Sequence, residues 1–121
     1  MMFDEIMQKA AEEPLVKSEV DAFCAQEAVS IDAFCDALAR RITTDYAKGD
    51  LPFLFCDSVA NHIFSFMIAF YQKPPPEFAY SVFLAFDQGE YRRAKDPVGS
   101  SLEELYTKPM IAMILGGEPV T

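Results

Sequence analysis

The sequence predicts an all-α fold, and three observations lead to that prediction. Apolar residues recur at intervals of three and four along most of the 121-residue chain, which places them on one face of a helix. Residues that start or stop helices, mainly Ser, Asp, Pro and Gly, stand between these apolar blocks. Hydrophobic residues make up 51% of the chain, enough to build a core at this length. We therefore expect one helical domain over residues 1–121, a bundle of about six helices.

Three helices are predicted in the first part of the chain. Apolar residues at helical spacing predict the first helix over residues 3 to 13, which Pro14 stops. Ser18 is expected to cap the second helix in the manner of a capping box. Ser30 is expected to cap the third helix, and Gly49 supplies its stop.

The second and third predicted helices contain nearly the same five-residue block near their starts. The block reads VDAFC up to Cys24 and IDAFC up to Cys35. In one continuous helix the two sulfur atoms would lie roughly 16 Å apart along the axis, too far for a disulfide or a shared metal ion. With a break before Ser30, each block is the first buried turn of its own helix. Phe and Cys are both readily buried, so the repeat predicts two similar core-facing helix starts with free, buried thiols.

Residues 52 to 71 and 77 to 88 are predicted as the two central apolar helices, with Asp50 as the cap of the first. The uninterrupted apolar part of the first, residues 63 to 71, is far shorter than the roughly 20 residues that span a membrane. We therefore expect a core helix and no membrane partner. The β-branched and aromatic content of the second permits a strand, so an α+β fold with a hairpin near Gly89 is the alternative.

The last predicted helix covers residues 102 to 115 and bends around Pro109. Its Met-rich end is apolar on several sides and needs cover, from the core of the molecule or from a second copy of the chain. A homo-oligomer formed through this C-terminal helix is therefore one prediction. The predicted core contains Phe34, Leu38, Ile42, Phe55, Ile63, Phe66, Phe70, Phe83 and Phe86.

The net charge of the chain is −9, and most of it lies before Arg40. Nucleic acids and anionic membranes repel such a protein, so the expected partner is a basic protein and not a nucleic acid or a membrane. The acidic surface could instead serve only to keep the protein soluble. The candidate partner-binding residues are Asp21, Glu27, Asp32 and Asp36.

Few residues in the sequence are candidates for catalysis or for binding a ligand. The one histidine, His62, would have to serve in any nucleophilic or acid–base mechanism that uses histidine. Phosphate-binding glycine motifs and zinc spacings are absent, and one histidine cannot supply the paired ligands of a di-iron bundle. We therefore expect no metal and no cofactor. The candidate ligand-binding residues are Asp57, Asn61, His62, Asp87 and Glu90.

Two functions follow from these patterns. The first is a small acidic protein-interaction module without catalytic activity, such as an adaptor, an inhibitor or an immunity-like protein. The alternative is a small-ligand or metal-assisted enzyme that uses the polar cluster on the central helices. The acidic start of the chain does not fit a secretory signal, and three cysteines without a CxxC motif fit a reducing compartment, so the expected location is the cytoplasm.

Overall fold

The computed structural model describes residues 1 to 117, which form six α-helices and a short π-helix with no β-strand among them. The all-α prediction is confirmed, and the alternative hairpin near Gly89 is wrong, because the segment before Gly89 is helical throughout. Residues 118 to 121 of the predicted domain lie outside the described part of the chain. The elements in order are α1 (Phe3–Ala10), α2 (Lys17–Glu27), α3 (Ile31–Ala47), α4 (Phe53–Tyr71), α5 (Glu77–Gln88), the π-helix η1 (Glu103–Thr107) and α6 (Lys108–Ile114).

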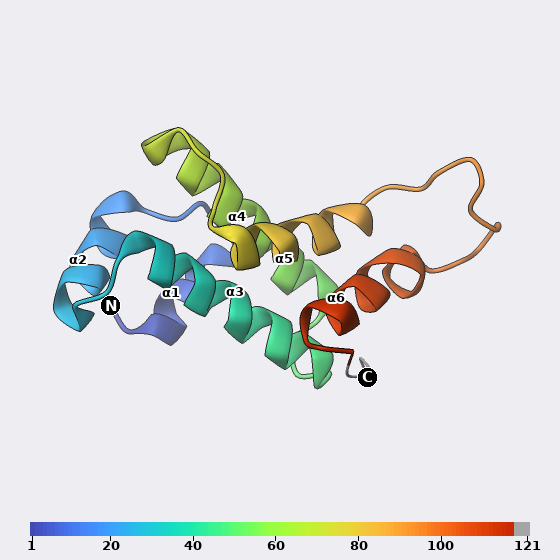
Figure 1. Cartoon of the computed structure of the whole chain (residues 1–121), viewed down its shortest axis with the longest axis horizontal. Coiled ribbons are helices and arrows are strands. Elements are labelled where there is room, and N and C mark those ends of the chain that lie inside the picture. Colours follow the sequence, from blue (N-terminus) through green and yellow to red (C-terminus); the bar gives the residue numbers. More distant parts are fainter. Residues whose placement is uncertain (118–121) are drawn as a thin grey trace.

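The helices surround one connected core that includes residues from α1 through α6. In Figure 1, α1 and α2 lie at one end of the elongated molecule and α6 at the other, with α3 running between them. As predicted, α4 and α5 pack against each other, and α3 packs against both. The connection between α5 and η1 projects from the end that α6 occupies.

The repeated sequence blocks begin two separate helices that meet through their phenylalanines. Ala28 takes the left-handed conformation that ends α2, and the Ser30 hydroxyl accepts a hydrogen bond from the Ala33 N–H at 3.0 Å. The rings of Phe23 and Phe34 lie 5.6 Å apart, and Phe3 of α1 completes a cluster of three. The three cysteines are free and buried. The prediction of two similar buried helix starts is confirmed.

Two predicted helix caps are wrong. Ser18 lies inside α2, whose N-cap is Val16, and its neighbour Lys17 begins the helix by pairing with Asp21 one turn later. Pro52 is the N-cap of α4 in place of Asp50, because the fixed backbone of proline already has the extended conformation that an N-cap requires. Each observed N-cap lies two residues from the predicted one, and the helix stays in place.

Six of the nine predicted core residues are fully buried, and the exceptions lie on α4 and α5. Phe55 and Phe83 are half-buried, and Phe83 stacks on the ring of Phe64 with a centroid distance of 4.2 Å. Phe70 is 48% exposed, so its assignment to the core is wrong. It lies in the last turn of α4, which extends beyond the neighbouring helices (Figure 1), so few side chains are available to cover it.

The predicted C-terminal helix is observed as η1 followed by α6, and the predicted bend at Pro109 takes the form of a widened turn. The Lys108 N–H donates to the carbonyl of Glu103, five residues earlier, which is π-helical spacing. Proline crowds the carbonyl four residues before it, so a regular α-helix cannot pass through this position. The Thr107 hydroxyl of η1 donates to the Ala85 carbonyl of α5 at 2.8 Å.

The close approach of η1 to α5 depends on a glycine. A side chain at Gly89 would collide with the Thr107 hydroxyl and would press on the ring of Phe53. Gly89 therefore does more than follow the end of α5, because it is the position that allows η1 to dock there.

Candidate functional site

Four of the five predicted ligand-binding residues come together where α4 passes the end of α5. Asp57 and Asn61 lie one helical turn apart on α4, and Asp87 and Glu90 lie at the end of α5. The Asn61 side-chain amide donates to Glu90 Oε2 at 3.0 Å. The Oδ1 atom of Asp57 is buried without a hydrogen-bond partner. We call Asp57, Asn61, Asp87 and Glu90 together the acidic cluster.

The acidic cluster favours a protonated carboxyl at Asp57. Burial is the largest of the effects that raise the pKa of Asp57 to about 8, and the carboxylate of Glu90 contributes to the same rise by accepting a hydrogen bond and by charge repulsion. The charge of Asp87 acts in the same direction, whereas the hydrogen bond from Asn61 opposes it. A carboxyl that titrates near neutral pH can donate or accept a proton, which is the basic requirement for acid–base chemistry.

The acidic cluster does not resemble a metal site. Within residues 1 to 117, no three His, Cys, Asp or Glu side chains lie close enough together to hold a metal ion. Structural and catalytic metal sites generally require at least three protein ligands. Asp57 and Glu90 could supply two, and no third group in this part of the chain lies close enough to join them.

His62, the fifth predicted residue, faces away from the acidic cluster. Its Nδ1 atom lies 2.7 Å from the carbonyl oxygen of Ala10, and the Ser58 hydroxyl donates to the same oxygen at 3.5 Å. Because a carbonyl can only accept, the Nδ1 atom carries the proton in this contact. His62 and Ser58 thus satisfy the carbonyl at the end of α1 and bind that helix to α4.

The cysteines do not provide a reactive thiol either. Burial is the main cause that raises the pKa of Cys35 and of Cys56 to about 12. Burial also raises the pKa of Cys24. Neighbouring acids add to the effect, because negative charge disfavours a thiolate. A Cys–His pair is therefore not assembled, since the thiols are buried and His62 is bound to α1.

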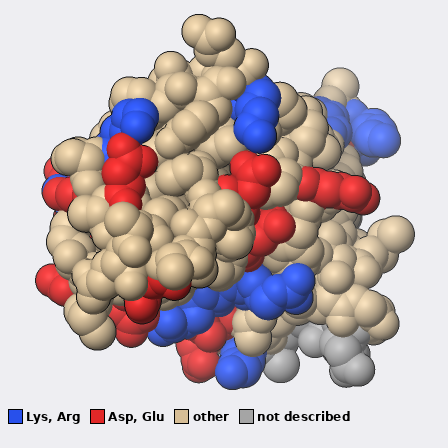
Figure 2. Space-filling view, turned by 60° about the vertical axis from the view of Figure 1, so that its left-hand side comes forward, with Lys and Arg blue, Asp and Glu red and all other residues tan. Residues whose placement is uncertain are grey.

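The four predicted partner-binding acids are placed along α2 and α3, and three of them contact other parts of the chain. Asp21 pairs with Lys17 at 2.7 Å, and Asp32 pairs with Lys73 at 3.5 Å. Asp36 accepts a hydrogen bond from the Ala79 N–H at 3.1 Å and so caps the start of α5. Glu27 is exposed and forms no ion pair. On the face in Figure 2, acidic side chains are scattered and several adjoin basic ones.

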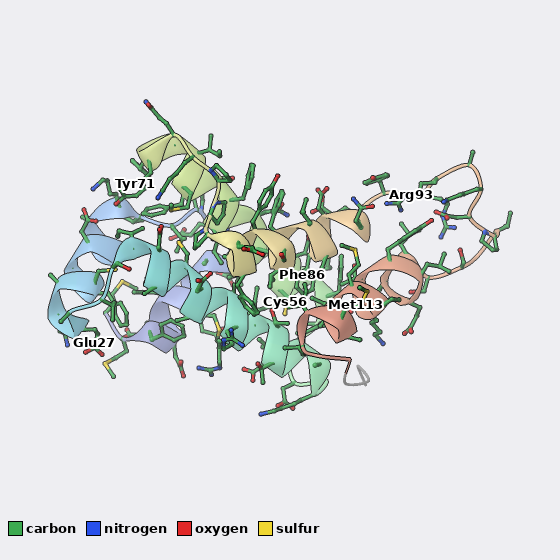
Figure 3. The ribbon with its side chains drawn as sticks, viewed as in Figure 1. Glu27, Cys56, Tyr71, Phe86, Arg93 and Met113 are labelled. Atoms are coloured by element: carbon green, nitrogen blue, oxygen red, sulfur yellow. The ribbon has the colours of Figure 1, made fainter. Side chains whose placement is uncertain are left out.

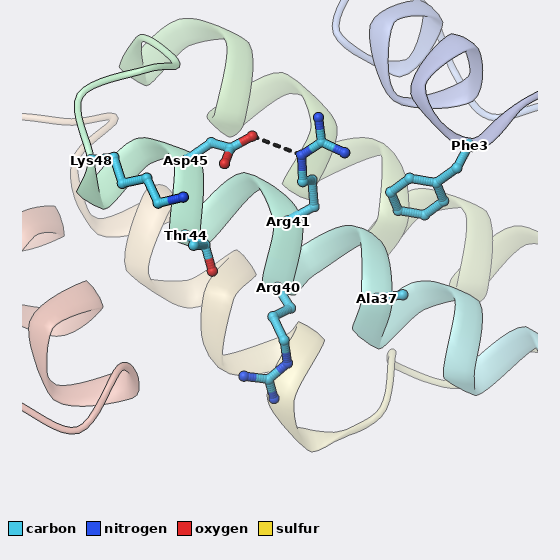
Figure 4. A pocket seen from close by; sticks show the side chains of 7 residues that line it. All are labelled: Phe3, Ala37, Arg40, Arg41, Thr44, Asp45 and Lys48. Atoms are coloured by element: carbon cyan, nitrogen blue, oxygen red, sulfur yellow. Dashed lines mark hydrogen bonds and ion pairs between the residues drawn. The ribbon is translucent and has the colours of Figure 1, made fainter.

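A shallow hollow on the outer face of α3, of about 650 Å³, was not predicted. Figure 4 shows its basic side chains pointing in different directions. Arg41 pairs with Asp4 and Asp45, each at 2.8 Å, and the guanidinium of Arg40 stacks 4.2 Å from the ring of Phe78. The lining residues are Phe3, Ala37, Arg40, Arg41, Thr44, Asp45 and Lys48.

A groove between α5 and α6 was also missed. It consists of two hollows of about 210 and 350 Å³ that share Ser81 and Ile114 as lining residues. The helical spacing of residues 77, 81 and 84 on α5 and of 110, 113 and 114 on α6 shows that each set shares one face of its helix, but not that the two faces meet. The groove residues are Glu77, Phe78, Ser81, Leu84, Met110, Met113 and Ile114.

Within residues 1 to 117, α4 is the one helix long and apolar enough to cross a membrane by length and composition. The mean hydropathy of an 18-residue stretch of α4 is 1.5, and 33% of that stretch is buried. Core helices of soluble proteins can have the same length and composition, so this property alone places α4 neither in a membrane nor outside one.

No protein-family model matches the chain, and no curated protein or solved structure is significantly similar to it.

Proposed function

We propose that this chain is a protein-interaction module without catalytic activity, an adaptor, inhibitor or immunity-like protein, and that its partner is a basic protein. The observation that carries the proposal is the apolar surface that α4, α5 and α6 leave uncovered in a strongly acidic molecule. Met113 of α6 is 78% exposed and Phe70 of α4 is 48% exposed, and Tyr80 and Leu84 of α5 add to this surface. Apolar patches framed by polar residues are typical of protein interfaces.

The charge distribution supports a basic partner. The chain has 19 acidic and 10 basic residues, and among residues 1 to 117 neither Glu27 nor Glu77 forms an ion pair. Uncompensated negative charge attracts a basic protein over a distance and accelerates its association. The same charge repels nucleic acid and anionic membranes, and we propose that neither is a partner. A cytoplasmic location, in keeping with the free thiols, is part of the same proposal.

The chemistry of the side chains supports a role without catalysis. His62 holds the end of α1, and the three thiols are buried. Neither provides the activated nucleophile and adjacent base that covalent catalysis uses.

A second candidate function, a small-ligand enzyme, is favoured by one observation. Asp57 is a carboxyl with a pKa of about 8 and a buried oxygen that has no hydrogen-bond partner. Such a group can act as a general acid or base near neutral pH. The metal-assisted form of this alternative has no support in the described residues, because no third ligand joins the acidic cluster.

The experiment that tests the proposed function combines capture of a partner with association kinetics. The partner is captured from native lysate, identified by mass spectrometry and purified. Its association rate is then measured over a salt series with the wild type and with the variant D21N/E27Q/D32N. Asp36 is left unchanged, because it caps α5. We expect a basic partner whose association slows with salt, since charges are screened beyond about 8 Å at physiological ionic strength, and which associates more slowly with the variant.

The matched control is the variant D45N/D50N/E104Q. It removes the same net charge and, like the test variant, changes two ion-paired acids and one unpaired acid. Its association rate should stay closer to that of the wild type. Equal rates for the wild type and D21N/E27Q/D32N across the whole salt series would contradict the steering role of α2 and α3.

A further inference from the structure

The groove between α5 and α6 has the form of a receptor for a helix. Its α5 wall is built from residues 77, 81 and 84, which follow one face of the helix at intervals of four and three. Residues 77 and 84 are seven positions apart, which corresponds to roughly 10 Å along the helix axis, or about two helical turns. Helix-in-groove recognition uses partner side chains at positions i, i+3 or i+4, and i+7, which cover the same length.

The floor and walls of the groove present few polar groups that would have to be desolvated. The Ser81 hydroxyl donates to the Glu77 carbonyl within its own helix at 2.9 Å, so it is already satisfied. Ser81 is also small, which allows a partner backbone to approach between the two walls. Met110 and Met113 form the α6 wall, and the flexible, polarisable methionine side chain adapts to partner side chains of different shapes.

The charge at one end of the groove selects the kind of helix. Glu77 is the one charged residue among the seven that line the groove, and its exposed carboxylate forms no ion pair in the described structure. Lys108, which begins α6, is already paired with Glu104 at 2.6 Å. A second copy of this chain would bring another net charge of −9 to the groove, whereas a basic helix would complement it.

We propose that the α5–α6 groove binds an amphipathic helix of the partner protein, with apolar residues at i, i+3 or i+4, and i+7 and a Lys or Arg beside Glu77. The proposal rests on the proposed function and adds the surface and the form of the partner. In Figure 3, Met113 lies on α6 at the end of the molecule opposite Glu27, so this groove and the acids of α2 are separate surfaces.

The experiment uses designed fluorescent peptides as probes. Two helix-favouring Leu/Lys peptides carry Leu at i, i+3, i+7 or at i, i+4, i+7, and a control peptide has the same composition in scrambled order. Binding to the wild-type protein is measured by fluorescence anisotropy. We expect at least one patterned peptide to bind about tenfold or more tightly than the scrambled one, because only the patterned peptides bury a continuous apolar face. Equal binding of all three peptides would overturn the proposal.

Variants locate the binding site. Met113→Asp should weaken binding of the patterned peptide about tenfold or more, as for a residue at the centre of an interface. Leu54→Asp is the matched control, since Leu54 is equally exposed but lies on α4 outside the groove, and it should leave the affinity within about twofold. Glu77→Gln should weaken binding about two- to fivefold, the range of an exposed ion pair, and Glu27→Gln should not. Equal losses in M113D and L54D would overturn the proposal.

Methionine methyl groups provide a direct readout in the unmutated protein. The chain has six methionines, of which Met7 and Met67 are buried in the core and Met110 and Met113 line the groove. With ¹³C-methyl methionine labelling, the patterned peptide should shift the signals of Met110 and Met113 and leave those of Met7 and Met67 unchanged. Shifts elsewhere with these two signals unchanged would overturn the groove as the binding site.

Two further outcomes would assign the groove to a different occupant. A wild-type dimer in sedimentation that Met113→Asp dissociates and Leu54→Asp does not would assign it to a second copy of the chain. Binding to neutral phosphatidylcholine vesicles that is lost in M113D, with no binding of the peptides, would assign it to a membrane. The function proposed above survives either result if the captured basic partner still associates with the salt dependence expected of it, so the two proposals fail separately.

Discussion

The helices α1 to α3 carry most of the negative charge of the molecule, whereas α4 to α6 carry most of its uncovered apolar surface. Up to Ala47, the end of α3, four bases and ten acids give a net charge of −6, and from Lys48 onward six bases and nine acids give −3. No large apolar residue within α1 to α3 is exposed, but α4, α5 and α6 each expose at least one. Negative charge and uncovered apolar surface are therefore separated along the chain.

The largest expected effect tests whether apolar residues in the two parts of the molecule differ in importance for folding. Phe34→Ala removes the fully buried ring of the α1–α3 cluster and should lower the free energy of unfolding by about 3–5 kcal/mol. Phe70→Ala removes a ring that is 48% exposed and should cost less than about 1.5 kcal/mol. Urea unfolding followed by far-UV circular dichroism measures both. Similar losses of unfolding free energy in the two variants would contradict the expectation that Phe34 matters more for folding than Phe70.

The next effect concerns the acidic cluster on α4 and α5. The pKa of Asp57 is 3.8 in its ordinary state and about 8 in the folded protein, so folding takes up a proton between these pH values. Because the pKa is raised in the folded state, the stability that Asp57 contributes is fully present below about pH 4 and is lost as the pH rises to about 8. Asp57→Asn removes this titration and should flatten the pH profile.

The size of this effect is limited because the acidic cluster is partly open to water. Above pH 8, Asp57→Asn should be more stable than the wild type by about 1–2 kcal/mol, less than the full pKa shift would imply. The measurement is the free energy of unfolding at several pH values between 4 and 9. Parallel profiles for the wild type and Asp57→Asn would show that Asp57 has the same pKa in the folded and the unfolded state, and would contradict the raised pKa.

The smallest expected effect distinguishes Asp36 from Glu27, which were both predicted from the sequence as partner-binding acids. Asp36→Ala removes the side chain that caps α5 and should cost about 1 kcal/mol. Glu27→Ala changes an exposed acid without an ion pair and should stay within about 0.5 kcal/mol of the wild type. Thermal unfolding of both variants tests the contrast. A loss at Glu27 equal to that at Asp36 would show that the cap contributes no more than a surface charge.

The sequence predicted the helices well because periodicity and stop residues are local signals. Ser30 and the repeated blocks are examples, since one hydroxyl and one apolar face determine where α3 starts and what it buries. The exposure of Phe70 could not be predicted, because it depends on how far α4 extends past its neighbours. Periodicity shows that a residue is apolar but not whether another helix reaches it.

The candidate site was predicted in part for the same reason. Asp57 and Asn61 are one turn apart on one helix, so their proximity is a local property, and Glu90 follows soon after the end of a neighbouring helix. His62 was misplaced because the carbonyl that it binds belongs to Ala10, 52 residues earlier in the chain. The α5–α6 groove was missed because its two walls become one surface only after η1 docks on α5.

The contact between Gly89 and Thr107 has a consequence for engineering of the chain. Because η1 is fixed directly on the end of α5, the placement of α6 does not depend on the length of the connection between them. That connection carries the fully exposed Val98, followed by Gly99, where a side chain would meet only open space. Exposed loop tips of this kind tolerate insertions. A peptide tag or a fluorescent domain placed between residues 98 and 99 should leave the helices in register, and the chain offers an internal attachment point.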